Sequence, residues 1–339
     1  MMTSPDLASL IDALPSVVVY VDDKLALDRR DASHASLALE AIAASRDARF
    51  ESDAPALPTD QAPTPLTLLV PPRFHSTVPL AIIHIAQSQP IHKAIHIELG
   101  QSAEMTLIAV THNEVNQSAT MHSSILVGDN AHLTMMSVNS SEGDGAHASR
   151  IRGHVNRDAT FNFAVGVFTH GPTHYDTEIT LAGPHAENES RVVALTDDAQ
   201  ETLINTRVIH KAPRTAGRIE HAGVAAGEST LLFEGVGKIH KGMVRSQAFQ
   251  HNRGVVLGDK ARLDANPLLL IDEHDVEAGH GAAIGRIDEN QLYYLMSRGM
   301  TKTEAEKLII QGYLAPLKRT ISHDALHARL DQLLNDKIK

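Results

Sequence analysis

The 339-residue sequence contains no cysteine and no tryptophan, and aromatic residues make up only 4% of it. Without cysteine the chain forms no disulfides, and its side chains supply neither a cysteine-based zinc site nor a catalytic thiol. The hydrophobic content of 42% is enough for a sizeable core. Because that core must consist mainly of Val, Ile, Leu, Ala and Met, we expect a narrow interior lined by small aliphatic side chains.

Other features that are missing exclude further classes of function. The formal net charge is −11, so a general basic surface for nucleic acid is not expected. There is no run of about 18 apolar residues, so no membrane span is expected. The N-terminus, "MMTSPDLASLIDALP", lacks a basic segment followed by an apolar one. We therefore expect a cytoplasmic protein.

The first 65 residues are expected to be helical and extended. Ser4 is suited to cap a helix whose first residue is Pro5. Residues 33–50, "SHASLALEAIAASRDARF", are rich in Ala and Leu and predict a second helix. The proline-rich residues 51–66 predict a linker or an extended arm.

From residue 66 to about residue 271 the sequence consists of short strand-like segments with a repeat. The copies "LGQSAEMTL", "VGDNAHLTM" and "VNRDATFNF" place Ala103, Ala131 and Ala159 at a constant spacing of 28 residues, and four weaker copies follow. Such a period is typical of architectures in which each unit buries its apolar face against the next. The repeat favours a parallel β-helix, with an antiparallel sandwich or jelly roll as the alternative.

A small helical unit is predicted to close the chain. Asp288 is a candidate N-cap, and Gly299 is a candidate stop for the same helix. Thr301 and Glu304 form a capping-box pattern for a second helix, and Ser322 begins a third. The apolar face of the third helix consists of Leu326, Leu330, Leu333 and Leu334.

Common catalytic and metal-binding motifs are absent. The sequence has 21 histidines but no HExxH, and His92 and His96 lie in a strand-like segment, where their spacing only places them on one face. No GxSxG is present, and "GVGKIHKG" at residues 235–242 lacks the spacing of a phosphate-binding loop. Any nucleotide energy must therefore come from another chain.

The segment "DVEAGHGAAIG" at residues 275–285 is unusual because a histidine, His280, lies between two glycines. Alternation would place Glu273, Asp275 and Glu277 on one face of a preceding strand. Two interpretations are open: a solvent-exposed strand and turn, or a carboxylate–histidine ligand set.

Residues 263–314 resemble the SufB/SufD family of iron–sulfur cluster assembly proteins. The resemblance is carried by the strand "NPLLLIDEHDV", the turn "GHGAAIG", and the helices "QLYYLMSRG" and "EAEKLIIQGYL". Residues 210–230 resemble the family's β-helix body more loosely, and the first 65 residues match little.

The resemblance implies an all-β core, a right-handed parallel β-helix at residues 66–285, between a helical and extended region at 1–65 and a helical region at 286–339. It also implies a non-enzymatic subunit of the SUF assembly complex, with a SufB-like paralogue and a SufC-like ABC ATPase as partners. The chain alone would hold no stable cofactor, and iron or an Fe–S cluster would be bound only transiently in the complex. Neither nucleic acid nor a membrane is an expected partner.

The missing cysteine indicates which branch of the family is most similar. SufB-type chains carry a cysteine and a glutamate around the corresponding turn, whereas Ala278 stands here where a cysteine is usual. Thiolates are the usual ligands of Fe–S clusters, so a chain without them cannot be the main scaffold. The sequence is most similar to the SufD type.

The resemblance makes His280 the candidate iron or cluster ligand, at a metal site shared with a partner, and makes Glu277 a second candidate. Gly279 and Gly281 would allow another backbone or a cluster to approach closely. The family places its ATPase contact on the helices at residues 288–314, where the candidate docking residues are Arg298, Lys302, Glu304 and Lys307.

Two other functions stay open from sequence alone. One is a β-helix carbohydrate-active enzyme of the polysaccharide lyase kind, which would need paired catalytic carboxylates and aromatic sugar platforms. The other is a structural homodimer. The sequence also leaves open whether iron, a flavin or a persulfide binds, and which protein donates the sulfur.

Overall fold

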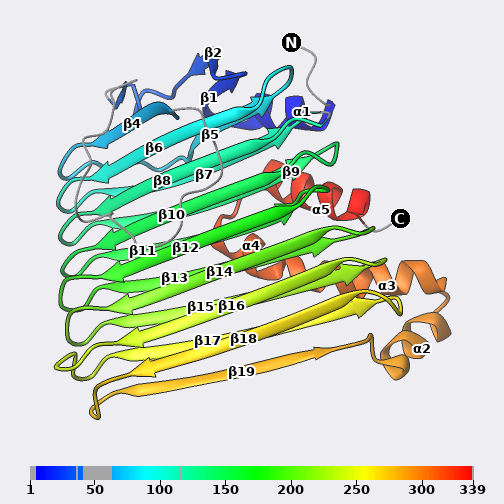
Figure 1. Cartoon of the computed structure of the whole chain (residues 1–339). Helices are drawn as coiled ribbons and strands as arrows, with labels where there is room; N and C mark the ends of the chain where they lie inside the picture. Colours follow the sequence, from blue (N-terminus) through cyan, green and yellow to red (C-terminus); the bar gives the residue numbers. More distant parts are fainter. Residues whose placement is uncertain (1–4, 36, 41–62, 115, 338–339) are drawn as a thin grey trace.

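In the computed structural model, residues 5–35, 37–40, 63–114 and 116–337 are described. They form a parallel β-solenoid in which two long sheets face each other (Figure 1). Sheet A contains, in chain order, β1 (Ser16–Val21), β2 (Lys24–Arg29), β5 (Leu80–Ala86), β7 (Glu104–Asn113), β9 (His132–Ser141), β11 (Thr160–Phe168), β13 (Glu187–Thr196), β15 (Ala216–Ala226), β17 (Gln247–Leu257) and β19 (Glu277–Gly285).

Sheet B contains β3 (Ala38–Glu40), β4 (Thr64–Val70), β6 (Ile91–Leu99), β8 (Ala119–Val127), β10 (His147–Val155), β12 (Thr173–Leu181), β14 (Glu201–His210), β16 (Thr230–Ile239) and β18 (Arg262–Ile271). The helices are α1 (Pro5–Ala13), α2 (Glu289–Ser297), α3 (Lys302–Gln311), the 3-10 turn η2 (Gly312–Leu314), α4 (Ala315–Thr320) and α5 (Asp324–Lys337). None of the helices in the described ranges is long and apolar enough to cross a membrane.

The 28-residue repeat is one full coil of the solenoid. Ala103, Ala131 and Ala159 are fully buried and lie immediately before β7, β9 and β11, at the same turn of three successive coils. His132 N donates to Ala103 O (2.8 Å), and Thr160 N donates to Ala131 O (2.9 Å). The stacking of the three alanines is therefore confirmed, and the antiparallel sandwich is excluded.

The turns repeat because each contains a residue in the left-handed region. Ser102, Asn130 and Asp158, one residue before each alanine, have φ angles of 57°, 56° and 55°. Among residues other than glycine, Asn and Asp tolerate this conformation best. The polar residues of the repeat thus turn the chain from sheet B into sheet A.

The interior is narrow and lined mainly by aliphatic side chains, as the composition predicts. Leu107, Met135 and Phe163 are register partners on β7, β9 and β11 and belong to the same buried cluster. Their side chains stack from coil to coil because parallel strands in register place equivalent residues on the same face. Each coil therefore buries its apolar face only against its neighbours.

The prediction for the N-terminal region is partly wrong. Helix α1 begins at Pro5, but Ser4 lies outside the described residues. Residues 16–29 form the antiparallel hairpin β1–β2, and β1 also pairs with β5. The run from Val17 to Val21, four valines and a tyrosine, favours this extended structure, and Asp22 and Asp23 both have positive φ, as a tight hairpin turn requires.

The helix predicted at residues 33–50 is also wrong for the described part of that range. Ala38–Glu40 is strand β3, which pairs antiparallel with β4. The rest of the prediction, and most of the proline-rich segment, lie outside the described residues. The helix propensity of the Ala and Leu residues is weaker than the stabilisation that this segment gains by pairing with β4.

The C-terminal helices cover a flank of the solenoid, not its end. Leu317 of α4 and Leu330 of α5 belong to a second buried cluster together with Ala164 and Phe168 on the outer face of sheet A, and Leu10 of α1 joins the same cluster. The predicted apolar face of the last helix is confirmed as buried, although α5 begins at Asp324 after the additional helix α4. The last coil is left without a helical cap (Figure 1).

Candidate functional site

The two ends of the solenoid differ. At the N-terminal end, the β1–β2 hairpin covers the interior of the first coils. Lys93 projects into this interior, and its side chain is only 2% exposed. Two residues of the hairpin contact it: Lys93 Nζ lies 3.4 Å from Asp23 Oδ1 and 4.6 Å from the centre of the Tyr20 ring. At the C-terminal end, β18 and β19 are the last strands of sheets B and A, and no described strand follows them. The last coil therefore exposes its interior face.

Large apolar side chains lie at this open end. Leu268 and Leu270 on β18 are 51% and 47% exposed, and Ile284 on β19 is 37% exposed. A solenoid normally needs a polar terminal unit to stay soluble. Leu268 and Leu270 are register partners of Val236 and Lys238 and so lie on the outer face of sheet B, whereas Ile284 lies in the interior-facing row of β19.

His280 lies in the middle of β19, not in a turn as the sequence predicted. It is the register partner of Gln250 on β17 and so belongs to the row that faces the interior. Gln250 is 1% exposed, whereas His280 is exposed because no further coil covers it. The imidazole is thus presented at the mouth of the solenoid.

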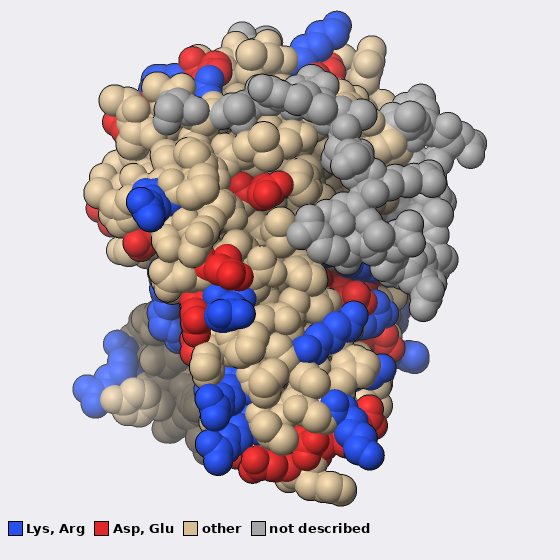
Figure 2. All heavy atoms as spheres, turned by 90° about the vertical axis from the view of Figure 1, so that its left-hand side faces the viewer, with Lys and Arg blue, Asp and Glu red and all other residues tan. Residues whose placement is uncertain are grey.

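The acidic residues do not form the predicted strand face. Asp272 to Asp275 form the turn between β18 and β19, and only Glu277 lies in a strand. The carboxylate of Glu273 accepts hydrogen bonds from Gly242 N (2.8 Å) and His274 N (2.8 Å), which lower its pKa. The turn is therefore a hydrogen-bonded structure, and it places a group of acidic side chains at the end of the molecule (Figure 2).

Glu277 and His280 are not brought together. They lie three positions apart on one strand, so their side chains project from opposite faces of sheet A. Gln247 Nε2 donates to Glu277 Oε2 (3.2 Å) on the outer face. Of the predicted ligand pair, His280 alone faces the mouth.

Gly279 and Gly281 are not required by this chain's own packing. A Cβ at Gly281 would meet no atom within 4 Å, and one at Gly279 would only contact the Phe249 ring at 3.5 Å. Neither glycine has a positive φ. The outer surface of β19 is therefore bare at these two positions, and another backbone could approach it closely.

A buried polar network forms the floor of the mouth. His221 Nδ1 lies 2.9 Å from Asn252 Oδ1, and His221 Nε2 lies 3.0 Å from Thr206 Oγ1. Burial lowers the pKa of His221 to about 4, so this imidazole is neutral. Gln250 spans the interior, and its Nε2 donates to Leu268 O on β18 (2.7 Å). The sequence reasoning missed these residues, because only pairing with β19 places them beneath His280.

Of the predicted ATPase-docking residues, Arg298 caps the C-terminal end of α2, and Lys302, Glu304 and Lys307 lie on α3. Asp288 accepts a hydrogen bond from Asn290 N (2.8 Å) as predicted, and Thr301 and Glu304 form the predicted capping box. The carboxylate of Glu304 therefore caps its own helix: its Oε2 accepts a hydrogen bond from Thr301 N (2.7 Å).

An exposed apolar surface adjoins these charges. Tyr293 is 76% exposed, and Tyr294, Met296 and Leu308 are also exposed. The guanidinium of Arg298 lies 5.3 Å from the centre of the Tyr294 ring. Helix α2 has no buried residue, so a partner can contact most of its surface.

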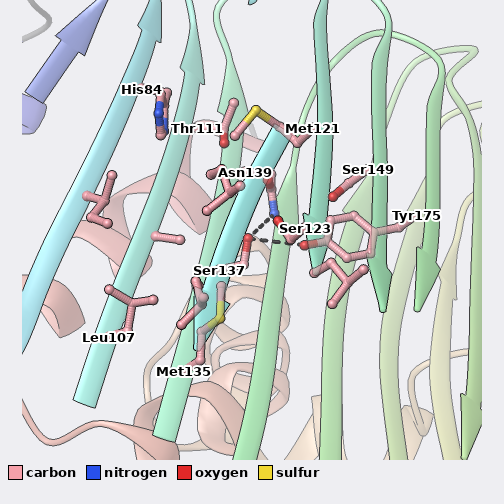
Figure 3. Close-up of a pocket in the computed structure, with 15 residues that line it drawn as sticks. His84, Leu107, Thr111, Met121, Ser123, Met135, Ser137, Asn139, Ser149 and Tyr175 are labelled. Atoms are coloured by element: carbon pink, nitrogen blue, oxygen red, sulfur yellow. Dashed lines mark hydrogen bonds between the residues drawn. The ribbon is translucent and has the colours of Figure 1, made fainter. Parts of the chain in front are cut away.

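Two hollows of the solenoid, one inside it and one on sheet B, lack the features of a sugar-hydrolase site. Inside the solenoid, a cavity of about 20 Å³ lies near Tyr175, whose Oη donates to Ser137 Oγ (3.1 Å), and Asn139 Nδ2 donates to the same oxygen (3.2 Å) (Figure 3). This volume suits about one water molecule. A groove of about 570 Å³ on the outside of sheet B has one carboxylate, Glu201, among its described lining residues, whereas sugar hydrolysis uses two.

No single-chain metal site is apparent among the described residues, which bring no three His, Asp or Glu side chains into a metal-binding arrangement. His92 and His96 lie on β6 as predicted, and His96 Nδ1 lies 2.9 Å from Ser124 Oγ.

Comparison with known proteins agrees with the resemblance seen in the sequence. The family model "SUF system FeS cluster assembly, SufBD core domain" matches residues 82–313. The iron–sulfur cluster assembly protein SufD of Bacillus subtilis is 32% identical over 278 residues, which cover 80% of this chain and 64% of that protein. SufD of Escherichia coli is 26% identical over 271 residues, which cover 76% of this chain and 63% of that protein.

A SufBD family protein of Mycobacterium tuberculosis is 31% identical over 143 residues, which cover 42% of this chain and 17% of that protein. The chain thus spans slightly less than two thirds of the length of the two SufD proteins. The matched residues include every coil from β5 to β19 and the helices α2 and α3. The chain therefore belongs to the SufBD core family of the SUF iron–sulfur cluster assembly system and is most similar to SufD.

Proposed function

We propose that this chain is a SufD-type, non-enzymatic subunit of a SUF assembly complex, with a SufB-type scaffold at its open end and a SufC-type ATPase on α2 and α3. The observation that carries the proposal is the exposed His280 on an uncapped last coil. In a chain without cysteine, this histidine can supply only one ligand to iron or to a cluster, and the thiolates must come from another chain.

The surroundings of His280 support a site shared between two chains. A neutral imidazole binds iron and can do so beside thiolates. Ile284 lies in the same interior-facing row as His280, and Leu268 and Leu270 lie on the outer face of β18, so apolar surface is available to a partner at both sheets of the last coil. The iron or cluster is the cargo of such a complex and is built where the two chains meet.

The ATPase contact is supported by a separate surface. Helix α2 presents exposed tyrosines, and α3 presents lysines and an exposed leucine, Leu308. Aromatic side chains next to cationic ones are common at protein interfaces. Because these helices follow β19 directly in the chain, movement of the ATPase could be transmitted to the mouth.

Co-expression of the chain with the SufB-type and SufC-type paralogues of its own organism tests the proposal. His280→Ala is expected to lower the iron and sulfide content of the purified complex while leaving its subunit composition intact. The matched control is His274→Ala, which removes an exposed histidine in the neighbouring turn and should leave the content unchanged. Equal iron and sulfide content in both variants would contradict the role of His280.

A further inference from the structure

Two successive turns of the solenoid carry the same basic pattern. Residues 209–214, "IHKAPR", and 239–245, "IHKGMVR", begin at the ends of β14 and β16. Arg214 N donates to Val244 O (2.9 Å), so the two turns stack on each other. Together with the last outward-facing residue of β16, they carry five cationic side chains, which we call the basic corner: Lys211, Arg214, Lys238, Lys241 and Arg245.

The two arginines of the basic corner are unusual for their backbone positions. Arg214 and Arg245 have φ angles of 58° and 59°, and backbone hydrogen bonds from coil to coil align them with Asn130 and Asp158 of earlier turns. Asn and Asp adopt this left-handed conformation more readily than arginine does. The turn itself therefore does not explain the arginines, and residues held in a disfavoured conformation often have a functional role.

The basic corner has few carboxylate partners. Its single ion pair with the described residues joins Arg245 Nε to Asp275 Oδ2 at 3.8 Å, and both side chains are about two thirds exposed. The other four cationic groups have no ion pair in the part of the chain that the structure describes. Burial lowers the pKa of His240, and the charges of Lys238 and Lys211 lower it further, so these ammonium groups lie near the imidazole.

Carboxylates bound the basic corner in both directions along the solenoid. On one side is the acidic turn, where Glu273 accepts a hydrogen bond from Gly242 N (2.8 Å). On the other side, Asp158 Oδ1 lies 3.0 Å from His185 Nδ1. Figure 2 shows Lys and Arg side chains over the lower coils on this side of the molecule, with Asp and Glu below them. The positive surface is thus limited to about two coils, or roughly 10 Å along the solenoid.

Apolar side chains lie among the charges. Val244 is 37% exposed, and Pro213 and Met243 are partly buried in the same two turns. Protein interfaces combine apolar contacts with charged ones in this way. A bilayer or a nucleic-acid duplex would extend beyond the basic corner and meet the flanking carboxylates, which would repel it. The surface therefore suits a short anionic segment with apolar residues.

We infer that the basic corner binds a short acidic segment of a protein partner in extended conformation. The segment crosses the two turns, with carboxylates toward Arg214 and Arg245 and an apolar side chain on Val244. These turns follow the ends of the sheet B strands, whereas α2 and α3 lie at the opposite side of the solenoid (Figure 1). The interaction is additional to the proposed function and does not depend on it.

Replacing the two arginines by asparagine tests the inference. Because asparagine tolerates the left-handed conformation, Arg214→Asn combined with Arg245→Asn should not lower the melting temperature. The probe is a short fluorescent peptide of alternating Asp and Leu, and a peptide with Asn in place of Asp is its neutral counterpart. Fluorescence anisotropy should show that the Kd for the acidic peptide rises at least about fivefold, as the loss of two exposed ion pairs predicts. The neutral peptide should not bind.

A charge-matched control distinguishes a local site from general attraction. Lys260→Asn combined with Arg286→Asn also removes two exposed cations, which pair with Glu228 and Asp259. Here the Kd should change by less than about twofold, because salt screens charges that are far from the peptide.

A second double variant leaves the left-handed arginines in place. Lys211→Gln combined with Lys241→Gln removes two charges of the basic corner without changing a residue of positive φ. It should also weaken binding of the acidic peptide, which would confirm that the charges are needed and not the conformation of the turn.

Several results would overturn the inference. No binding of the acidic peptide, or an unchanged Kd in both variants of the basic corner, would show that this surface is not the site. An equal rise in Kd for the charge-matched control would show that net charge alone attracts the peptide. Sedimentation of the chain with vesicles of phosphatidylcholine and phosphatidylglycerol, lost in Arg214→Asn with Arg245→Asn, would identify a lipid surface as the occupant instead.

Discussion

Gln250 on β17 and His280 on β19 are register partners on adjacent parallel strands, yet Gln250 is almost fully buried and His280 is exposed. The interior of the solenoid thus becomes surface within a single coil. His221, Asn252 and Gln250 form a buried polar network up to β17, and the next residue in the interior-facing row, His280 on β19, is exposed. Whatever covers the last coil contacts His280 directly.

Gly281→Val is expected to show whether the glycine is required for binding of the partner and not for folding of the chain. A Cβ at this position meets nothing within 4 Å, so the thermal stability of the isolated chain should be unchanged. Capture of the SufB-type paralogue should fall, because the branched side chain would hold the partner away from β19. The matched control is Gly153→Val, whose Cβ would lie 2.6 Å from Ile179 Cδ1 in the interior. It should destabilise the fold by about 1–3 kcal/mol. Normal capture by Gly281→Val would show that the bare surface is not an interface.

Variants that test the proposed ATPase surface should leave Glu304 unchanged. A charge reversal there would remove the carboxylate that caps α3 and would confuse binding with local unfolding. Tyr293→Ser combined with Lys302→Glu changes exposed side chains and should weaken pull-down of the SufC-type ATPase with little change in melting temperature. Thr301→Ala serves as the comparison, since it should lower helix stability without changing the exposed surface of α2. Equal pull-down by the double variant would place the contact elsewhere.

Acid should destabilise the solenoid through its buried histidines. Burial lowers the pKa of His84 to about 3, and it lowers the pKa of His112, His147 and His210 to about 4. These groups are neutral in the folded chain and take up protons on unfolding below their ordinary pKa of 6.5. Their stabilising contribution is therefore complete above pH 6.5 and is lost as the pH falls toward 4, by roughly 1.4 kcal/mol per histidine for each pH unit.

Urea denaturation at pH 7.5 and pH 5.5 measures this effect. His84→Phe should reduce the pH dependence, because it keeps a ring against Tyr20 (5.1 Å between ring centres) but removes one titrating group. A free energy of unfolding that does not change between the two pH values would contradict the assignment of neutral, buried histidines.

The contacts of Lys337 should stabilise the packing of the C-terminal end of α5 against the solenoid. Its buried Nζ lies 2.5 Å from Asp197 Oδ1 and 3.1 Å from Gln200 Oε1, and it also contacts His170 Nδ1 at 3.3 Å. Lys337→Met is expected to cost about 2 kcal/mol, less than a fully buried broken ion pair because Asp197 keeps some access to solvent. Hydrogen exchange should show faster opening of α5 with unchanged protection of β11. Uniform loss of protection would instead indicate that α5 and the solenoid unfold together.

Much of the fold could be read from local patterns. The repeat of Ala103, Ala131 and Ala159 predicted parallel coils because each turn has the same local requirement, a polar residue in the left-handed region followed by a small buried one. The capping box of Thr301 and Glu304 and the apolar face of α5 were also predictable, since both depend on residues three or four positions apart. The missing cysteines already meant that any cluster thiolates would have to come from another chain.

Tertiary structure decided what lies between distant residues. Glu277 and His280 were both candidate ligands of one site, but the strand conformation of β19 places them on opposite faces. The hairpin at residues 16–29 forms because β5 is available to pair with it, and β5 lies more than fifty residues further along the chain. The exposure of His280 at the last coil and the buried floor beneath it both depend on which side of a strand faces its neighbour. That choice is made by sheet register, which is set by contacts between residues far apart in sequence.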